Sequence, residues 1–463
     1  MTRAPISRPS GPRSRPVPNR RAVIAGGAAA LLAAGTGADA APARSGAGLF
    51  VTRDGTAFRL DGRRYSYAGA NLWYGAWLGA DAPYGDRARL SRELDRLAAL
   101  GVDNLRILAA AEDSPLRNSV KPAFRGPGSH YDETLLGGLD HLLSELGRRG
   151  MRAVLYLTNF WEWSGGMMTY LYWTNGGRYL NMNDPAHPWP EFPDFVARFY
   201  GSGGAVTLYR DYVRTVVGRT NGITGRAYRD EPAIMAWQLA NEPRPAGSET
   251  VGRPNLPAFY AWIRDTARLI KALDPNHLVS TGSEGLKGSL ESEEVVLAAH
   301  AFPEIDYLTA HVWPQNWSWV DAADIPGSWP RCERLVREYV AQHIAMAARL
   351  GKPLVIEEFG FPRDGVLYDP GTSTVYKDRY YRLIYDLVLA DARAGGPAAG
   401  SNFWAWNGEG RAAHADHRFQ AGDTAWLGDP PHELQGWYGV FESDSSTQTI
   451  VRDHAAAMRA LRV

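Results

Sequence analysis

The alternation of short apolar segments with longer amphipathic ones constrains the fold of this chain most strongly. Amphipathic stripes with a helical period cover residues 87–100, 133–149, 256–273, 331–350 and 375–394. Eight short apolar segments precede or separate such stripes, and we predict them to be strands: 65–71, 102–108, 152–158, 233–240, 277–281, 306–312, 353–358 and 400–406. Eight strands that alternate with helices predict an α/β fold, a (β/α)8 TIM barrel.

Three segments add to this repeating unit. Residues 49–67 alternate apolar and polar side chains around Asp61-Gly62, which predicts a short N-terminal β-hairpin. Long aromatic loops, 160–200 and 407–446, follow the third and eighth strands. Loops that follow barrel strands gather at the C-terminal face, so we expect these two to shape a cleft there. No linker composition interrupts residues 45–463, and we expect residues 41–463 to form a single catalytic domain.

The first forty residues have the features of an export signal. Arg20-Arg21 precedes an apolar run, 22–37, that ends in Ala38-Asp39-Ala40. These features predict a twin-arginine signal peptide over residues 1–40 and a secreted protein. The apolar run is shorter than the ~20 residues that span a bilayer, so we expect no membrane anchor.

Composition narrows the classes of partner. The chain has 50 basic and 50 acidic side chains, so its formal net charge is zero and a nucleic-acid partner is not expected. Cys332 is the only cysteine, which excludes an internal disulfide, and its helical context predicts a structural thiol. The 16 tryptophans exceed what core packing needs, so we expect several to line a surface.

Two carboxylates end short apolar runs. Glu242 lies in Trp237-Gln-Leu-Ala-Asn-Glu-Pro-Arg244, and Glu358 lies in Leu354-Val-Ile-Glu-Glu-Phe-Gly360. They are 358 − 242 = 116 positions apart, which is about three strand and helix repeats of roughly 40 residues. We therefore expect them on non-adjacent strands of one closed sheet, facing each other across a cleft. Such a pair is what glycoside hydrolysis uses.

These two segments resemble the acid/base and nucleophile strands of glycoside hydrolase family 5, in clan A. The resemblance covers nearly the whole chain after the signal. Further segments similar to the endo-β-1,4-mannanase branch of that family are 159–167, 280–285, 311–317, 403–411 and 435–444.

The resemblance implies distinct roles for the two carboxylates. Glu242 would be the general acid and base, and Glu358, directly before Phe359-Gly360, would be the nucleophile. Glu357, the residue before Glu358, would not be the nucleophile. Because consecutive strand residues point to opposite faces, only one of Glu357 and Glu358 should face the barrel mouth, and we expect Glu357 to pair with a base behind the sheet.

The resemblance also implies a set of residues around this pair. Arg106 matches the family's second-strand arginine, which would hold the nucleophile ionised. His311 matches the sixth-strand histidine, although a satisfied core histidine is the alternative. Asn241 would bind the sugar 2-OH, and Trp404 would be the aromatic floor under the sugar. Trp313 replaces a tyrosine of many relatives and is a candidate sugar platform.

Other candidates are less specific. We expect His300 to pack in the core or face solvent, and no His, Cys and Asp spacing or phosphate loop indicates a metal or another cofactor. Glu284, in a turn bounded by glycines, is the strongest acidic candidate for a glycan contact. The remaining candidate glycan contacts, each of which could instead pack the rim of the cleft, are Trp73, Asn159, Trp161, Trp163, Trp317 and Glu409.

The signal and the carboxylate pair predict a secreted retaining glycoside hydrolase, and the resemblance implies that it is a mannan endo-1,4-β-mannosidase. It would act as a monomer on mannan, glucomannan, galactomannan or manno-oligosaccharides through an ester on Glu358. Alternatives left open by the sequence are a cellulase or other clan A β-glycanase and an exo-acting mannosidase or mannobiohydrolase, since loops choose the substrate. A carbohydrate-binding protein without catalysis is a further alternative.

Overall fold

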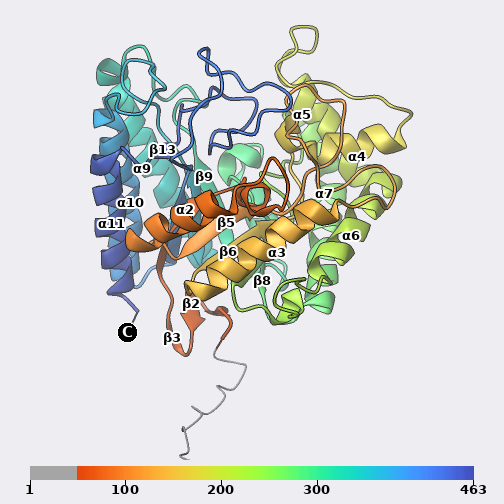
Figure 1. Cartoon of the computed structure of the whole chain (residues 1–463), viewed down its shortest axis with the longest axis horizontal. Coiled ribbons are helices and arrows are strands. Elements are labelled where there is room, and N and C mark those ends of the chain that lie inside the picture. Colours follow the sequence, from red (N-terminus) through yellow and green to blue (C-terminus); the bar gives the residue numbers. More distant parts are fainter. Residues whose placement is uncertain (1–48, 463) are drawn as a thin grey trace, which may run out of the picture. The chain divides into compact units, whose positions relative to one another are not determined.

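The computed structural model of the chain describes residues 49–462, and the predicted signal peptide lies outside the described residues. Eight parallel strands form one sheet in the order β8-β7-β6-β5-β4-β11-β10-β9 (Figure 1). The first strand, β4, thus pairs with the last, β11, so the predicted (β/α)8 barrel is confirmed. The strands are β4 (Tyr67–Asn71), β5 (Asn104–Leu108), β6 (Arg152–Tyr156), β7 (Ile234–Gln238), β8 (Leu278–Ser280), β9 (Leu308–Val312), β10 (Leu354–Phe359) and β11 (Ala398–Phe403).

The remaining seam of the barrel lies between β8 and β9. Here the backbone N–H of Asp306 donates to the carbonyl of Val279 over 2.7 Å. In return, the Asp306 carboxylate accepts from the N–H of Val279 over 2.7 Å. A side chain therefore replaces part of the strand ladder, and β8 is shorter than the predicted segment 277–281.

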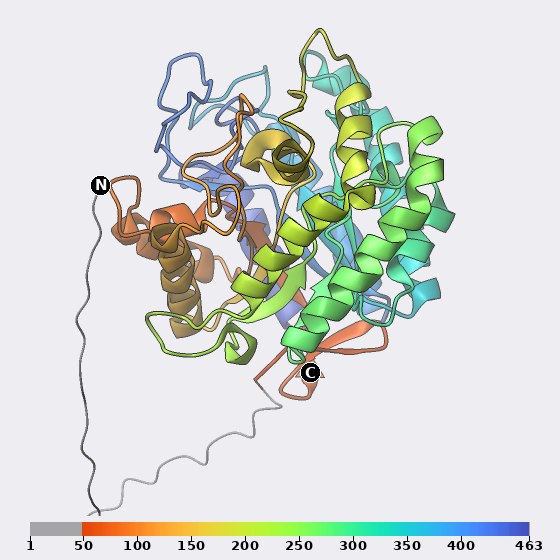
Figure 2. The ribbon, with the colours of Figure 1, turned by 90° about the vertical axis from the view of Figure 1, so that its right-hand side faces the viewer.

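Helices lie alongside the strands (Figures 1 and 2). Two of them, α7 and α9, begin earlier than predicted, at Glu249 and Ile325. Pro254 and Pro330 lie inside these helices, in their second turns. Because proline is unfavourable in a helix, the sequence pattern starts each helix too late. The helices around the barrel are α2 (Arg87–Ala99), α3 (Glu133–Arg148), α6 (Gly203–Val217), α7 (Glu249–Leu273), α8 (Glu293–His300), α9 (Ile325–Leu350), α10 (Val375–Arg393) and α11 (Ser445–Arg459).

A small antiparallel sheet packs against the N-terminal end of the barrel. The predicted hairpin is present, as β2 (Ala57–Leu60) and β3 (Arg63–Arg64), but β1 (Thr52–Asp54) adds a third strand to it. Phe58 of β2 lies 5.3 Å from the ring of Tyr307 and 6.5 Å from that of Tyr67. These contacts fill the lower barrel with apolar side chains and leave the opposite end for a site.

The two long loops lie at that opposite end (Figure 1). The loop after β11 is held by the buried Asp429 carboxylate, which accepts from the N–H groups of Gly436 and Tyr438 over 2.9 and 2.7 Å. The loops and other connections contain α1 (Gly75–Gly79), η2 (Glu162–Ser164), α4 (Gly166–Thr174), α5 (Glu191–Val196), η3 (Ala197–Gly201), η4 (Tyr228–Asp230), η5 (Leu286–Gly288), β12 (Trp406–Gly408) and β13 (Val440–Phe441).

Two sequence expectations concern single features of the helices. Cys332 is buried on α9, and burial raises the pKa of its thiol to about 12, as suits a structural residue. His300 is fully buried at the end of α8, where it packs in the core as one alternative foresaw. Among residues 49–462, no helix is both long and apolar enough to cross a bilayer.

Candidate active site

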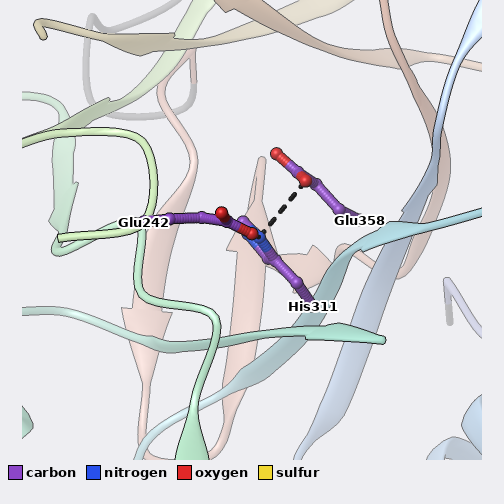
Figure 3. A group of neighbouring side chains, drawn as sticks. All are labelled: Glu242, His311 and Glu358. Atoms are coloured by element: carbon purple, nitrogen blue, oxygen red, sulfur yellow. Dashed lines mark hydrogen bonds and ion pairs between the residues drawn. The ribbon is translucent and has the colours of Figure 1, made fainter. Parts of the chain in front are cut away.

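Glu242, His311 and Glu358 lie together at the C-terminal ends of β7, β9 and β10 (Figure 3). One carboxylate oxygen of each glutamate and one ring nitrogen of His311 all lie within 4.8 Å of one another. His311 Nδ1 is 2.6 Å from Glu242 Oε1 and 3.3 Å from Glu358 Oε2. The two carboxylates thus share one imidazole nitrogen.

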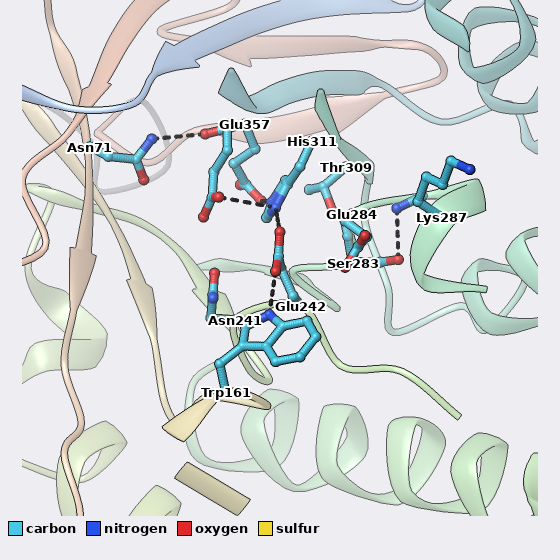
Figure 4. Close-up of polar contacts among 12 residues, drawn as sticks. Asn71, Trp161, Asn241, Glu242, Ser283, Glu284, Lys287, Thr309, His311 and Glu357 are labelled. Carbon is cyan, nitrogen blue, oxygen red and sulfur yellow. Dashed lines mark hydrogen bonds and ion pairs between the residues drawn. The ribbon is translucent and has the colours of Figure 1, made fainter. Parts of the chain in front are cut away.

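The backbone around Glu242 is unusual. Its φ is +49°, a left-handed conformation that is rare outside glycine, and its N–H donates to the Gly282 carbonyl over 2.9 Å. The side chain also accepts from the indole N–H of Trp161 (Figure 4). Strained conformations of this kind cost of order 1–3 kcal/mol and gather at functional sites, where they aim a side chain.

Arg106 of β5 organises the floor beneath the pair. Its guanidinium donates to Glu358, to Asn241 Oδ1 over 2.7 Å and to Gln238 Oε1 over 2.9 Å. Arg106 is fully buried, so its charge acts on Glu358 with little screening by water. Asn241, beside Glu242, is thereby fixed in orientation.

The structure corrects the expectation for Glu357. Its register places Ile356 opposite Ala310 and Glu358 opposite His311, so Glu357 is an extra residue in a β-bulge. The bulge breaks the alternation of faces. Glu357 points into the barrel, as Val355 does two residues earlier, and the bulge brings Glu358 to the barrel mouth as well. The Glu357 carboxylate has Arg106 and His311 as its neighbours and does not pair with a base behind the sheet.

Burial and charge set the proton count of this cluster. Burial raises the pKa of Glu358 to about 7, although the charges of His311 and Arg106 oppose the rise. Burial also acts to raise the pKa of Glu242, but the hydrogen bond and charge of His311 lower it to about 2. The carboxylates outweigh the burial of His311 and raise its pKa to about 10. Near neutral pH these shifts favour Glu358 over Glu242 as the carboxyl group that holds a proton.

A cleft of about 1000 Å³ opens above the pair. Nine of the predicted residues line it: Trp161, Trp163, Asn241, Glu242, Glu284, Trp313, Trp317, Glu358 and Trp404. Aromatic rings beside a few fixed polar groups are what a sugar needs, because a sugar has apolar faces and hydroxyl edges.

A family model described as GH family 5 β-mannosidase-like matches residues 48–462. The chain belongs to glycoside hydrolase family 5. The match includes all residues that the structure describes, so the resemblance to this family is confirmed.

Named relatives and solved structures agree with this placement. Mannan endo-1,4-β-mannosidase 1 of Oryza sativa subsp. japonica is 31% identical, over 79% of this chain and 80% of its own length. The crystal structure of a family 5 mannosidase from Rhizomucor miehei is 35% identical, with a TM-score of 0.81, and covers 90% of this chain and 99% of that one. The endo-1,4-β-mannanase of Rhizomucor miehei, 24% identical with a TM-score of 0.63 over 89% and 99% of the two chains, shares the fold.

Three predicted glycan contacts do not line the cleft of the family 5 chain. Trp73 is buried behind Trp163 and donates its indole N–H to the Gly428 carbonyl over 2.8 Å. Asn159 is fully buried, and its Oδ1 accepts from Asn241 over 3.2 Å. Glu409 pairs instead with Arg92 and Arg96 of α2. These three side chains support other residues and do not face a ligand.

The cleft also has residues that the sequence reasoning missed. Arg244, two residues after Glu242, lies over the rings of Trp161 and Trp189, at 4.8 and 5.7 Å. Trp189, 62% exposed, stacks on Trp161 at the rim. Arg244 ends the sequence segment 237–244 that contains Glu242, so the sequence could have identified it as a site residue. Of the other missed residues, Glu249 begins α7 and Lys287 lies in η5. The rest come from loops: Met182, Asn183, Ala246, Gly247, Leu290, Glu291, Asn316, Pro430, His432, Glu433 and Trp437.

Glu242, His311 and Glu358 are also close enough in space to ligate a cation. Their contacts fit proton exchange better. Arg106 already places a positive charge on Glu358, and the raised pKa of His311, caused by its carboxylate neighbours despite burial, keeps the ring nitrogens protonated. A protonated nitrogen is no metal ligand, so we assign the cluster to acid and base chemistry.

Proposed function

We propose that this family 5 chain is an exported retaining glycoside hydrolase that cleaves β-1,4-mannosidic bonds of mannans or manno-oligosaccharides. The observation that carries the proposal is the separation of the two carboxylates. Oxygens within 4.8 Å of each other fit the ~5–5.5 Å between carboxyl groups of retaining enzymes and leave no room for the ~6.5–9.5 Å of inverting ones.

In the first step Glu358 attacks the anomeric carbon while the bond from that carbon to the leaving oxygen breaks. Glu242 gives its proton to the leaving oxygen, and a glycosyl ester forms on Glu358. In the second step the ionised Glu242 takes a proton from water. The resulting oxygen attacks the anomeric carbon, the ester bond breaks, and Glu358 leaves as a carboxylate. Both glutamates then return to their starting state.

The reaction requires the shared proton on Glu242, whereas burial and the position of His311 favour it on Glu358 in the empty site. His311 Nδ1 can correct this, because it lies 2.6 Å from one carboxylate and 3.3 Å from the other. When its hydrogen bond moves from Glu242 to Glu358, the pKa of Glu358 falls and that of Glu242 rises. We expect a bound sugar to favour this move, because its leaving oxygen contacts Glu242.

Relatives support a mannoside substrate. The rice relative is named a mannan endo-1,4-β-mannosidase, and the Rhizomucor miehei mannosidase has a crystal structure in complex with mannosyl-fructose. Export by the twin-arginine route rests on Arg20-Arg21 and the apolar run that follows.

Glutamine variants of the two glutamates test the chemistry. Glu242→Gln and Glu358→Gln should each lower kcat on mannotetraose by ~10²–10⁴-fold or more while the far-ultraviolet circular dichroism stays unchanged. Proton NMR of the first product should show the β-anomer, as retention requires. Release of the α-anomer, or undiminished turnover by Glu358→Gln, would rule out the mechanism.

A second candidate is exo action, which releases single sugars from a chain end. Three residues of the loop after β11 line the cleft, and each has a buried polar atom without a hydrogen-bond partner among the described residues: His432 Nδ1, Glu433 Oε2 and Trp437 Nε1. The hydroxyls of a terminal sugar could satisfy them. The β-mannosidase-like family description and the 35% identical mannosidase also favour this mode.

The products from reduced mannohexaose separate the two modes. Exo action releases mannose alone at early times, whereas endo action releases a mixture of shorter oligosaccharides. In the exo case Glu433→Ala should raise KM by ~10-fold, because a buried sugar hydroxyl left without its hydrogen-bond partner costs about 1–3 kcal/mol. An unchanged KM in that variant would contradict the role of this loop.

A further inference from the structure

Glu357 is a third carboxylate inside the catalytic end of the barrel, and the proposed reaction does not use it. It shares the inward face of Val355 on β10, and it is only 1% exposed. Its Oε1 accepts a hydrogen bond from Gln238 Nε2 (Figure 4 shows Glu357 beside His311). A buried carboxylate is costly unless charges or hydrogen bonds compensate it, so its partners indicate its purpose.

The second oxygen of Glu357 has no hydrogen bond but faces two cations. Oε2 lies 3.6 Å from Arg106 Nε and 3.7 Å from His311 Nε2. His311 Nε2 likewise has no hydrogen-bond partner among the described residues. The two unpartnered atoms thus face each other, and His311 has Glu357 at one ring nitrogen and the catalytic pair at the other.

The charges of this cluster balance only with Glu357 included. Arg106 and protonated His311 contribute two positive charges, and three ionised carboxylates contribute three negative ones. The cluster is neutral when one carboxylate holds a proton, which is the state in which the reaction begins. Without the charge of Glu357, the cluster would be neutral with both Glu242 and Glu358 ionised and no acid available.

We propose that Glu357 is a positioning residue whose fixed negative charge, acting through Arg106 and His311, retains one proton on the catalytic pair. This role rests on the proposed function, because it matters only where Glu242 must begin protonated. It also gives a reason for the bulge in β10, which places the consecutive residues Glu357 and Glu358 on the same side of the strand.

The other titratable groups around Glu357 do not supply this charge. Arg106 and His311 are cations, and burial raises the pKa of each nearby tyrosine far above neutrality, so these phenols stay uncharged. Glu357 in turn adds to the raised pKa of Glu358, after burial and the other charges, and to that of His311. The facing groups are Tyr67 at β4, Arg106 on β5, Tyr156 on β6, Glu242 after β7, Tyr307 and His311 at β9, and Glu358 on β10.

The pH profile of kcat/KM tests the proposal, because a purely structural residue would not move it. Glu357→Gln keeps an oxygen for Gln238 and removes only the charge. We expect its alkaline limb to shift to lower pH by about one to two units, the size of effect that a charge within ~4–6 Å exerts. Glu357→Asp retains the charge and should keep the alkaline limb within about half a unit of wild type.

The leaving group provides a second readout. A dinitrophenyl β-mannoside needs no proton from Glu242, whereas mannobiose does. At pH 7, Glu357→Gln should lose at least ~10-fold on mannobiose and less than ~3-fold on the dinitrophenyl substrate, because only general-acid assistance is lost. Equal losses on both substrates with an unmoved alkaline limb would overturn the proposal.

A third measurement covers the case in which Glu357→Gln does not fold. In wild-type protein labelled with ¹⁵N-histidine, the His311 signals, assigned with His311→Asn, should report an imidazolium at pH 8, since its carboxylate neighbours raise its pKa to about 10 despite burial. A neutral ring at pH 8 would overturn the charge balance. Failure of wild-type enzyme on every β-mannoside would instead sink the proposed function.

Discussion

Arg244 donates two hydrogen bonds to the Glu284 carboxylate, over 2.9 and 2.7 Å, on the wall of the catalytic cleft. Glu284 is 1% exposed in its side chain and Arg244 is 12% exposed. Two-pronged pairs of this kind fix a guanidinium in one plane. The fixed guanidinium of Arg244 covers the ring of Trp161. The pair therefore positions an aromatic ring that donates a hydrogen bond to Glu242.

Removing one partner should therefore destabilise the fold and slow catalysis. We expect Glu284→Ala to lower the free energy of unfolding by about 3 kcal/mol, because it leaves Arg244 largely buried without its partner. Urea unfolding measures this change. Glu338→Gln, which breaks an exposed pair with Arg334, is the matched control and should cost less than ~1 kcal/mol. Equal effects in the two variants would contradict a buried role.

Stability should depend on pH through Glu358. Because burial raises its pKa from 4.5 to about 7 in the folded state, the folded protein holds an extra proton between these values, and stability falls as pH rises through that window. Glu358→Gln lacks this penalty. Relative to wild type, the variant should gain up to ~3 kcal/mol between pH 4 and pH 8 in urea unfolding. A difference that is constant with pH would contradict the shifted pKa.

Asp429 should control the loop after β11 and not the barrel. Its buried carboxylate accepts from backbone N–H groups of Gly436, Tyr438 and Gly439. We expect Asp429→Asn to lower kcat/KM by ~10-fold or more, and to lower the free energy of unfolding by only ~1–3 kcal/mol. Limited proteolysis should then cut within residues 409–436. The exposed Asp416→Asn in the same loop is the control, and cleavage of both variants at the same rate would exclude this role.

The thiol of Cys332 should be inert in the folded protein. It is fully buried, and burial raises its pKa to about 12, so almost no reactive thiolate is present at neutral pH. Ellman's reagent should label it within minutes in guanidinium chloride and not over hours in buffer. Rapid labelling of the native protein would show that α9 opens locally.

The sequence predicted the barrel strands well because a strand covered by helices on one side and core on the other must be apolar throughout. All eight predicted strands are present, although most are two or three residues shorter than their predicted segments. At β8, Asp306 replaces part of the strand ladder. The helix starts of α7 and α9 were hidden by prolines. Local preference and the final structure disagree at those positions.

Sequence motifs identified the site residues at the strand ends, but they did not identify the loop residues that line the cleft. Glu433 and Trp437 reach the cleft only because Asp429 folds their loop back, and no periodicity encodes such a path. Glu357 was misplaced for a different reason. Glu357 follows the regular alternation from Val355, and the bulge after Ile356 brings Glu358 to the same side, so both acids face inward.

The pairing of β4 with β11 has a consequence for how the chain reaches this structure. Gly69 lies opposite Asn402, so the contact that completes the ring joins two segments from nearly opposite ends of the described sequence. Contacts of such high order form late, because the entropy of closing a long loop must be overcome first. A nascent chain that lacks residues 398–403 exposes the unpaired edges of β4 and β10, and unpaired strand edges are prone to self-association. Chaperone protection until synthesis ends is the expected requirement.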